Sequence, residues 1–213
     1  MLGILCGIES EAKIARQIKG AIVLCAAARP RKARELAREL VAQGATRLMS
    51  FGIAGSLDSS VLLGDIFVGT RVASAKGQWL CDEAWGRELA SKIPHAKRGS
   101  VYGSEALIAT ITKKGALHQN TGCALVDMES QCVAEVAAAA KIPMIVVRAV
   151  CDDCVMNVPP LVKVAIAEDD GSINIFRALG HLVCHPLQIV DLLHIARGTS
   201  KALSALRAVR PFI

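Results

Sequence analysis

The chain has few aromatic residues and no long uncharged apolar run. Only 3% of its 213 residues are aromatic, which disfavours a stacking surface for single-stranded nucleic acid, because such surfaces need exposed rings. Lys141 and Arg148 interrupt the best candidate for an 18-residue apolar span, so we expect a soluble protein without a transmembrane helix. The N-terminus lacks a basic region and meets Glu9 and Glu11 at once, so no signal peptide is expected.

Charge is sparse and unevenly distributed. Charged residues make up 21% of the chain, and the formal net charge is +6. Residues 171–213 contain five basic residues and one acidic residue, so most of the excess lies in this segment. The nearly neutral remainder disfavours a nucleic-acid-binding protein. The basic, apolar C-terminal segment leaves contact with a membrane surface or an anionic ligand open.

Eight cysteines without an export signal indicate mostly buried free thiols of a cytosolic protein. Cys151 and Cys154 form a C-x-x-C motif, which is compatible with a redox pair or half of a zinc site. His181 and His185 stand at i and i+4, but Pro186 follows and indicates a helix end. Because no second pair completes a ligand set, no metal site is expected.

Short apolar runs alternate with amphipathic or alanine-rich stretches. The runs predict strands at Leu2–Ile8, Ala21–Ala26, Arg47–Phe51, Asp65–Val72, Gly99–Gly103, Cys123–Met128 and Pro143–Val150. The other stretches predict helices at Glu9–Ile18, Pro30–Ala42, Leu80–Lys92, Ile108–Leu117, Ser130–Ala140 and in two or three segments after Pro160. This alternation predicts an α/β three-layer sandwich. We expect one domain spanning 1–213, of which 171–213 is a basic helical extension.

Acidic residues follow three of the predicted strands. They occur in the segments Gly7–Glu11, Val126–Ser130 and Val150–Cys154, and a fourth junction, Ser50–Ser56, is rich in glycine and uncharged. Ligand sites of open α/β sheets form where strands end and helices begin. Acids that converge there without basic partners are costly to cluster, so this pattern indicates a functional site.

These four segments resemble the purine nucleoside phosphorylase and methylthioadenosine/S-adenosylhomocysteine nucleosidase family. The resemblance runs from Met1 to about Asp153, and its most specific part is Val-Asp-Met-Glu-Ser (126–130) together with Val-Arg-Ala-Val-Cys-Asp (147–152). It implies that family's fold, with a central mixed β-sheet. The remainder, with Pro159 and Pro160 and a tail rich in Leu and Arg, resembles the hopanoid-associated phosphorylase subgroup, which is thought to remove adenine from adenosylhopane.

The resemblance assigns two carboxylates to catalysis. Asp152 matches the general acid that protonates adenine at N7, and neighbouring Asp153 is a like charge that favours its protonated form; Arg148 would oppose this if its side chain reached back. Glu11 matches the glutamate that orients and deprotonates the attacking water. The alternatives are a solvated loop or helix cap for Asp152 and Asp153, and simple helix stabilisation by Glu11 in a first turn.

Four further residues match family residues that bind the sugar and the base. Glu129 matches the glutamate that holds the two ribose hydroxyls, and Met128 matches the methionine beside the sugar. Leu107 stands where the family places a phenylalanine on adenine, and the backbone of Ile108 would read the base edge. Stabilisation of a helix N-terminus by Glu129 and core packing of Met128 and Leu107 are the alternatives.

The glycine-rich segment indicates whether water or phosphate is the nucleophile. Gly52, Ile53 and Gly55 match the family's binding turn. Where bacterial purine phosphorylases place an arginine and a serine, this chain has Ser50 and Ile53, so the strongest phosphate ligand is missing. This favours water, although Arg29, Arg31 or Arg148 remains available for phosphate.

Together these observations predict an enzyme that cleaves the N-glycosidic bond of a 5′-substituted adenosine and releases adenine. Adenosylhopane, in hopanoid lipid biosynthesis, is the expected substrate, and water is the favoured nucleophile. The alternatives are a phosphorylase that gives ribose 1-phosphate, a non-catalytic nucleoside-binding or membrane-surface module, and a redox module at Cys151 and Cys154. No cofactor is expected, apart from inorganic phosphate as co-substrate in a phosphorylase. We also expect a cytoplasmic homodimer, with peripheral contact to the inner membrane through 171–213 left open.

Overall fold

The computed structural model describes residues 1–27, 29–158 and 189–213. The helices expected between 160 and 188, together with His181 and His185, lie outside the described residues. The remaining expected elements can be compared with the structure directly.

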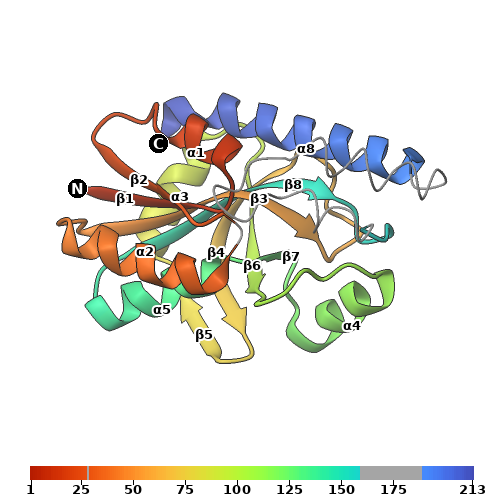
Figure 1. The fold of residues 1–213 in the computed structure, drawn as a ribbon, viewed down its shortest axis with the longest axis horizontal. Coiled ribbons are helices and arrows are strands. Elements are labelled where there is room, and N and C mark those ends of the chain that lie inside the picture. The colour runs from red at the N-terminus through yellow and green to blue at the C-terminus, as the bar shows by residue number, and fades with distance from the viewer. Residues whose placement is uncertain (28, 159–188) are drawn as a thin grey trace.

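The described strands form one mixed sheet (Figure 1). They are β1 (Leu2–Cys6), β2 (Ala21–Cys25), β3 (Arg47–Ser56), β4 (Ile66–Ser74), β5 (Gly77–Leu80), β6 (Lys97–Gly103), β7 (Leu125–Asp127) and β8 (Met144–Asp152). The order along the sheet is β2-β1-β3-β7-β6-β4-β5, and β8 pairs with both β3 and β4. Because β3 also pairs with β7, strands β3, β8, β4, β6 and β7 close a circuit of hydrogen bonds.

Six α-helices and a short 3-10 helix (Arg210–Phe212) complete the described part of the chain. The α-helices are α1 (Glu9–Ala15), α2 (Pro30–Ala42), α3 (Glu83–Lys92), α4 (Ile111–Thr121), α5 (Ser130–Ala140) and α8 (Ile189–Val209). The bounds of α2 and α5 agree with those expected from the sequence. Local chemistry sets the start of α3, where Asp82 accepts a hydrogen bond from the Trp85 amide, and the end of α4, where Gly122 adopts a left-handed conformation.

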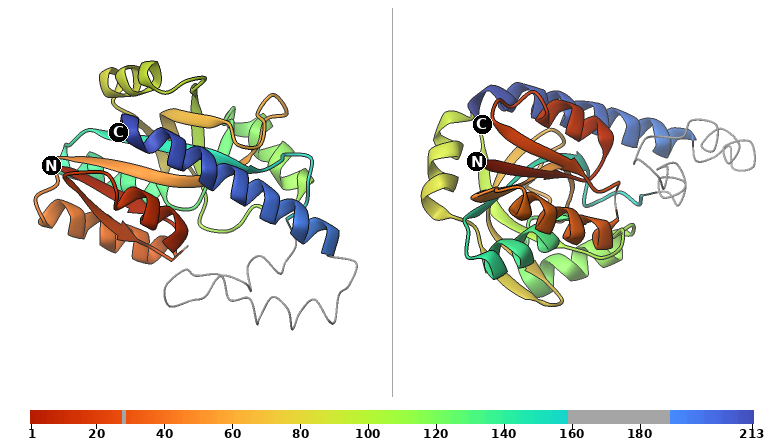
Figure 2. Two further views of the ribbon diagram at one scale, coloured as in Figure 1. Left: turned by 90° about the horizontal axis from the view of Figure 1, so that it is seen from above. Right: turned by 60° about the vertical axis from the view of Figure 1, so that its left-hand side comes forward.

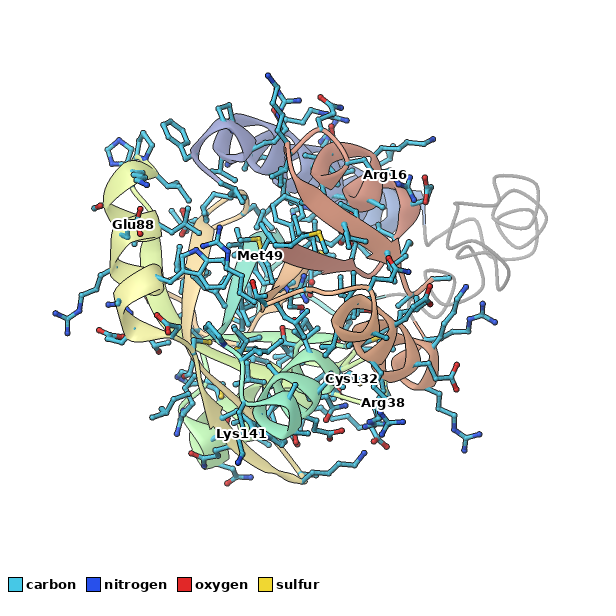
Figure 3. All side chains as sticks on the ribbon, turned by 90° about the vertical axis from the view of Figure 1, so that its left-hand side faces the viewer. Arg16, Arg38, Met49, Glu88, Cys132 and Lys141 are labelled. Carbon is cyan, nitrogen blue, oxygen red and sulfur yellow. The ribbon has the colours of Figure 1, made fainter. Side chains whose placement is uncertain are left out.

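The sheet is covered on both faces. Along β3, Met49 and Phe51 pack toward α1, α3 and α8, whereas Leu48 and Ala54 pack toward α2 and α5. Figure 2 shows α1 and α8 on one side of the strands and α2 and α5 on the other. Met49 lies in the interior, while Arg38 on α2 and Glu88 on α3 lie at the surface (Figure 3). The three-layer α/β sandwich with a central mixed sheet is therefore confirmed.

Three local predictions were wrong. The glycine-rich segment Ser50–Ser56 is not a turn after a short strand but the second half of β3, with a shift in pairing register between Ala54 and Gly55. Ile108 is not helical, because α4 begins only at Ile111, after the capping residue Thr110. Leu80 does not begin a helix: it ends the edge strand β5 (Gly77–Leu80), which pairs antiparallel with β4, and α3 begins only at Glu83.

Within residues 1–27, 29–158 and 189–213, none of the helices combines the length and apolarity needed to cross a bilayer. The long helix α8 instead lies across β8 (Figure 1). Its residues Ala202, Leu206 and Val209 are buried in a core cluster to which α1 and α3 also contribute residues. Part of the expected C-terminal helical segment thus packs on the sheet.

The contact of α8 with β8 depends on Gly198. A β-carbon added there would lie well inside contact distance of the Cys151 carbonyl oxygen, whereas one added at helical Gly115 meets nothing within 4 Å. We expect Gly198→Ala to lower the free energy of unfolding by about 1–3 kcal/mol through overpacking. The matched control Gly115→Ala should raise it by up to about 1 kcal/mol. Urea denaturation of both variants tests this, and equal effects would contradict it.

Candidate active site

A pocket opens where β1, β7 and β8 end, beside the irregularity in β3. Its walls are mainly apolar and include four acidic residues, and they are formed by Gly7, Ile8, Glu11, Ile53, Ala54, Gly55, Ala106, Leu107, Ile108, Val126, Asp127, Met128, Glu129, Cys151, Asp152, Val158, Ile195 and Thr199. Glu11, Glu129 and Asp152, which are far apart in the sequence, therefore share one pocket. Such a combination of apolar walls and few polar groups is typical of a small-molecule site.

Glu11 extends from the first turn of α1 and is buried. Its carboxylate accepts hydrogen bonds from the backbone amides of Gly7 (2.7 Å), Ile8 (3.0 Å) and Ile53 (2.8 Å). Burial raises the pKa of Glu11, and the Arg148 guanidinium and these amides partly oppose the rise. A carboxylate whose pKa is raised in this way is a better proton acceptor near neutral pH.

Glu129 lies directly before α5 and is also buried. Burial raises its pKa to about 8; the Arg148 guanidinium opposes this rise, while Asp127 and Glu11 add to it. The Arg148 Nη2 atom lies 3.8 Å from Glu129 Oε2. Burial thus favours the protonated form of Glu129, which can donate as well as accept a hydrogen bond.

Arg148 is fully buried below the pocket and binds Asp127. Its Nε donates to Asp127 Oδ2 (2.6 Å) and its Nη2 donates to the Ser50 hydroxyl (2.6 Å), which Ser130 also contacts. The expectation that the acids lack basic partners was therefore wrong, because β8 alternation turns Arg148 toward them. Asp127, Ser130 and Ser50 all stand in the motifs that indicated the site, but those motifs did not reveal their contacts with Arg148.

Asp152, at the end of β8, has a basic partner as well. Lys114 of α4 donates to Asp152 Oδ2 and to the carbonyl oxygen of Asp153. The Asp153 carboxylate points to His194, with 3.9 Å between Oδ2 and Nε2. Sequence reasoning missed this ion pair of Asp152 with Lys114, because Lys113 and Lys114 look alike. The effect of the like charge of Asp153 on Asp152 stays a prediction.

Each of the three carboxylates lies against a glycine. A β-carbon on Gly7 would come within 2.8 Å of Glu129, one on Gly52 within 2.6 Å of Glu11, and one on Gly55 within 2.7 Å of Asp152. Gly55 pairs with Asp152 in the register of β3 and β8, just after the register shift. Gly52 is not itself in the pocket wall, but it makes room for Glu11. Because glycine has no β-carbon, each of these three carboxylates can lie directly against the backbone.

The predicted sugar and base residues also line this pocket. Met128, Leu107 and Ile108 form apolar wall, and Ile53 does so while its amide binds Glu11. Three wall residues that no motif indicated are Val158, Ile195 and Thr199. The last two come from α8, so only the packing of that helix brings them to the site.

Of the other candidate groups Arg29, Arg31, Cys151 and Cys154, only Cys151 lies in the described pocket wall. The exposed side chains of Arg29 and Arg31 are absent from this described wall. Cys151 and Cys154 are free thiols, and burial, followed by the charge of Asp152, raises the pKa of Cys151. In the part of the chain that the structure describes, no three His, Cys, Asp or Glu side chains gather so as to hold a metal ion.

Comparisons with known proteins agree with this fold. The family model described as Phosphorylase superfamily matches residues 17–171. The fold is similar to futalosine hydrolase of Helicobacter pylori, with a TM-score of 0.71, 14% identity and coverage of 100% of this chain and 97% of that one. It is also similar to methylthioadenosine/S-adenosylhomocysteine nucleosidase of Neisseria meningitidis (TM-score 0.74, 11% identity, coverage 99% and 97%). S-adenosylhomocysteine nucleosidase of Streptococcus pyogenes gives a TM-score of 0.69 at 15% identity, with coverage of 98% and 94%.

The raised pKa of Glu129 predicts a pH effect on stability. Between about pH 5 and about pH 8 the folded protein keeps a proton on Glu129 that the unfolded chain has released. The contribution of Glu129 to the free energy of unfolding therefore falls as pH rises through this range. Glu129→Gln removes this loss. We expect urea midpoints of the variant, relative to wild type, to improve as pH is raised. Exposed Glu88, whose pKa is lowered by Lys92, supplies the control: Glu88→Gln should show a constant difference from wild type across this range.

Proposed function

Because the chain belongs to the phosphorylase superfamily, we propose that it cleaves the N-glycosidic bond of a 5′-substituted adenosine and releases adenine. The supporting observation is the convergence of Glu11, Glu129 and Asp152 on one apolar pocket. Cleavage of this bond develops positive charge on ribose and negative charge on the base. Carboxylates stabilise the first, and a proton donor is needed for the second.

Three residues carry the reaction in this proposal. Asp152 gives a proton to N7 of adenine while the bond from C1′ to the base breaks and its electron pair moves to the base. Glu129 binds the ribose hydroxyls. Water adds its oxygen to C1′, and its proton passes to Glu11, whose pKa is raised by burial. The sum is one water consumed and one adenine and one free sugar formed.

The proposal of water rather than phosphate rests on the donors near Glu11. The amide of Ile53, in the segment that would bind an anion, already donates to the Glu11 carboxylate. Phosphate at this place would face that negative charge, and Ser50 is held inside the protein by Arg148. The phosphorylase alternative has one supporting feature: among the described residues, Nη1 of Arg148 is buried without a hydrogen-bond partner.

For the 5′ substituent we propose an apolar group, and adenosylhopane in particular. The apolar pocket wall, including Ile8, Val158 and Ile195, supports an apolar substituent, and the sequence resemblance supports the hopanoid. We further propose one domain over 1–213, action in the cytoplasm as a homodimer, and no metal or organic cofactor. Contact of the basic C-terminal segment with the inner membrane surface would bring a lipid-linked nucleoside to the pocket.

Substrate and nucleophile can be tested together. The protein is incubated with adenosine, methylthioadenosine and adenosylhopane, with and without inorganic phosphate, and free adenine is measured by chromatography. We expect fastest release from adenosylhopane, independent of phosphate. Strict phosphate dependence would overturn the choice of water, and preference for methylthioadenosine would overturn the substrate assignment.

The role of Asp152 predicts a large and specific loss of activity. Asp152→Asn removes the acid but keeps its size, and we expect the rate of adenine release to fall about 10²- to 10⁴-fold. The control is Asp65→Asn, which removes a carboxylate paired with Lys97 outside the described pocket wall and should leave the rate unchanged. Adenosine binding without turnover in wild type, with no effect of Asp152→Asn, would instead support a non-catalytic nucleoside-binding module.

A further inference from the structure

Lys114 is a buried lysine that faces the acid of the proposed reaction. Its side chain is 1% exposed, and its ammonium group donates to Asp152 Oδ2, to the Asp153 carbonyl oxygen (2.6 Å) and to the Met156 carbonyl oxygen (3.3 Å). All three N–H groups therefore have oxygen acceptors. Burial of an ammonium group is costly unless it is paired in this way, so the local structure is built around a charged Lys114.

The contacts of Lys114, together with those at the start of α4, join two walls of the pocket. At the start of α4 the Ile111 amide donates to Asn157 Oδ1 (3.0 Å), and the Val158 amide donates to the Ala109 carbonyl oxygen (2.7 Å). Leu107 and Ile108, which precede α4, line the proposed base slot. Lys114 thus connects the element that carries Asp152 with the segment that would hold the base.

The pair leaves the two oxygens of Asp152 in different surroundings. Oδ2 is bound to Lys114, whereas Oδ1 lies 3.4 Å from Cys151 Sγ and against Gly55. The remaining charged neighbour, Asp153, directs its carboxylate to His194. No other described lysine or arginine forms an ion pair with Asp152, so Lys114 is the cation that acts on it.

We propose that Lys114 is a positioning residue for Asp152. Its ammonium group orients the carboxyl group through Oδ2 and stabilises the carboxylate that remains after Asp152 has given its proton to the departing base. This inference rests on the proposed function of Asp152 as the acid.

The test compares Lys114→Met with Lys113→Met, which removes the exposed neighbouring lysine of the same helix. For Lys114→Met we expect kcat for adenine release to fall about tenfold to a hundredfold, less than when the acid itself is removed, with KM little changed. Lys114→Gln, which keeps a hydrogen-bond donor without charge, should also lower kcat and serves as the second variant if Lys114→Met does not fold. Lys114→Arg, which keeps both the charge and the donors, should restore part of the lost kcat.

A lysine that only stabilises the fold would lower the thermal midpoint and leave kcat of the folded enzyme unchanged, and that result would overturn the proposal. Equal kcat values for the Lys114 and Lys113 variants would do so too. If wild type releases no base from any nucleoside, the proposed function fails by itself. Urea denaturation of Lys114→Met, Asp152→Asn and the double variant then decides the positioning: non-additive midpoints support it, and additive midpoints contradict it.

Discussion

The structure depends on placing four acidic side chains in one apolar pocket with a polar partner for each. Backbone amides bind Glu11, the guanidinium of Arg148 binds Asp127 and lies 3.8 Å from Glu129, and the ammonium of Lys114 binds Asp152. Arg148 and Lys114 are themselves buried, so removal of either would leave an acid in a low-dielectric site without its cation. The shape of the pocket and its electrostatics are thus coupled.

These partners differ in how strongly they favour the charged form of the carboxyl group that each contacts. Glu129 keeps a pKa of about 8 despite Arg148, since burial and the neighbouring acids outweigh that cation. Asp152 is at the pocket wall, with its side chain 13% exposed and in direct contact with Lys114. One site can obtain both an acid and a base when its neighbouring carboxyl groups lie in different environments, because these environments favour different protonation states.

The second constraint on the site is that its carboxylates lie very close to the backbone. The register shift in β3 brings Gly55 opposite Asp152, and Gly52 and Gly7 leave room for the other two carboxylates. The covering helix α8 imposes the same requirement at Gly198. Any side chain at these positions would move a carboxylate or a helix, so the glycines determine the site as much as the acids do.

Much of the fold could be predicted because its signals are local. Apolar runs marked seven of the eight described strands, and residue patterns placed α2 and α5 at their observed bounds. The edge strand β5 was missed, since its pairing with β4 supplies the stability that its own sequence lacks. The continuation of β3 through Ser56 was missed for a similar reason: glycine indicates a turn locally, while pairing with β8 keeps the segment extended.

The sequence by itself determined the α/β class, the family resemblance and the three acidic motifs, because these are written in short contiguous segments. Only the tertiary structure decided which cations face those acids and which residues of α8 complete the wall. Lys114 and Arg148 meet their partners across separations of 38 and 21 residues, and side-chain direction there follows from strand register and helix packing. Such contacts depend on how elements are assembled in space, and no local pattern records that.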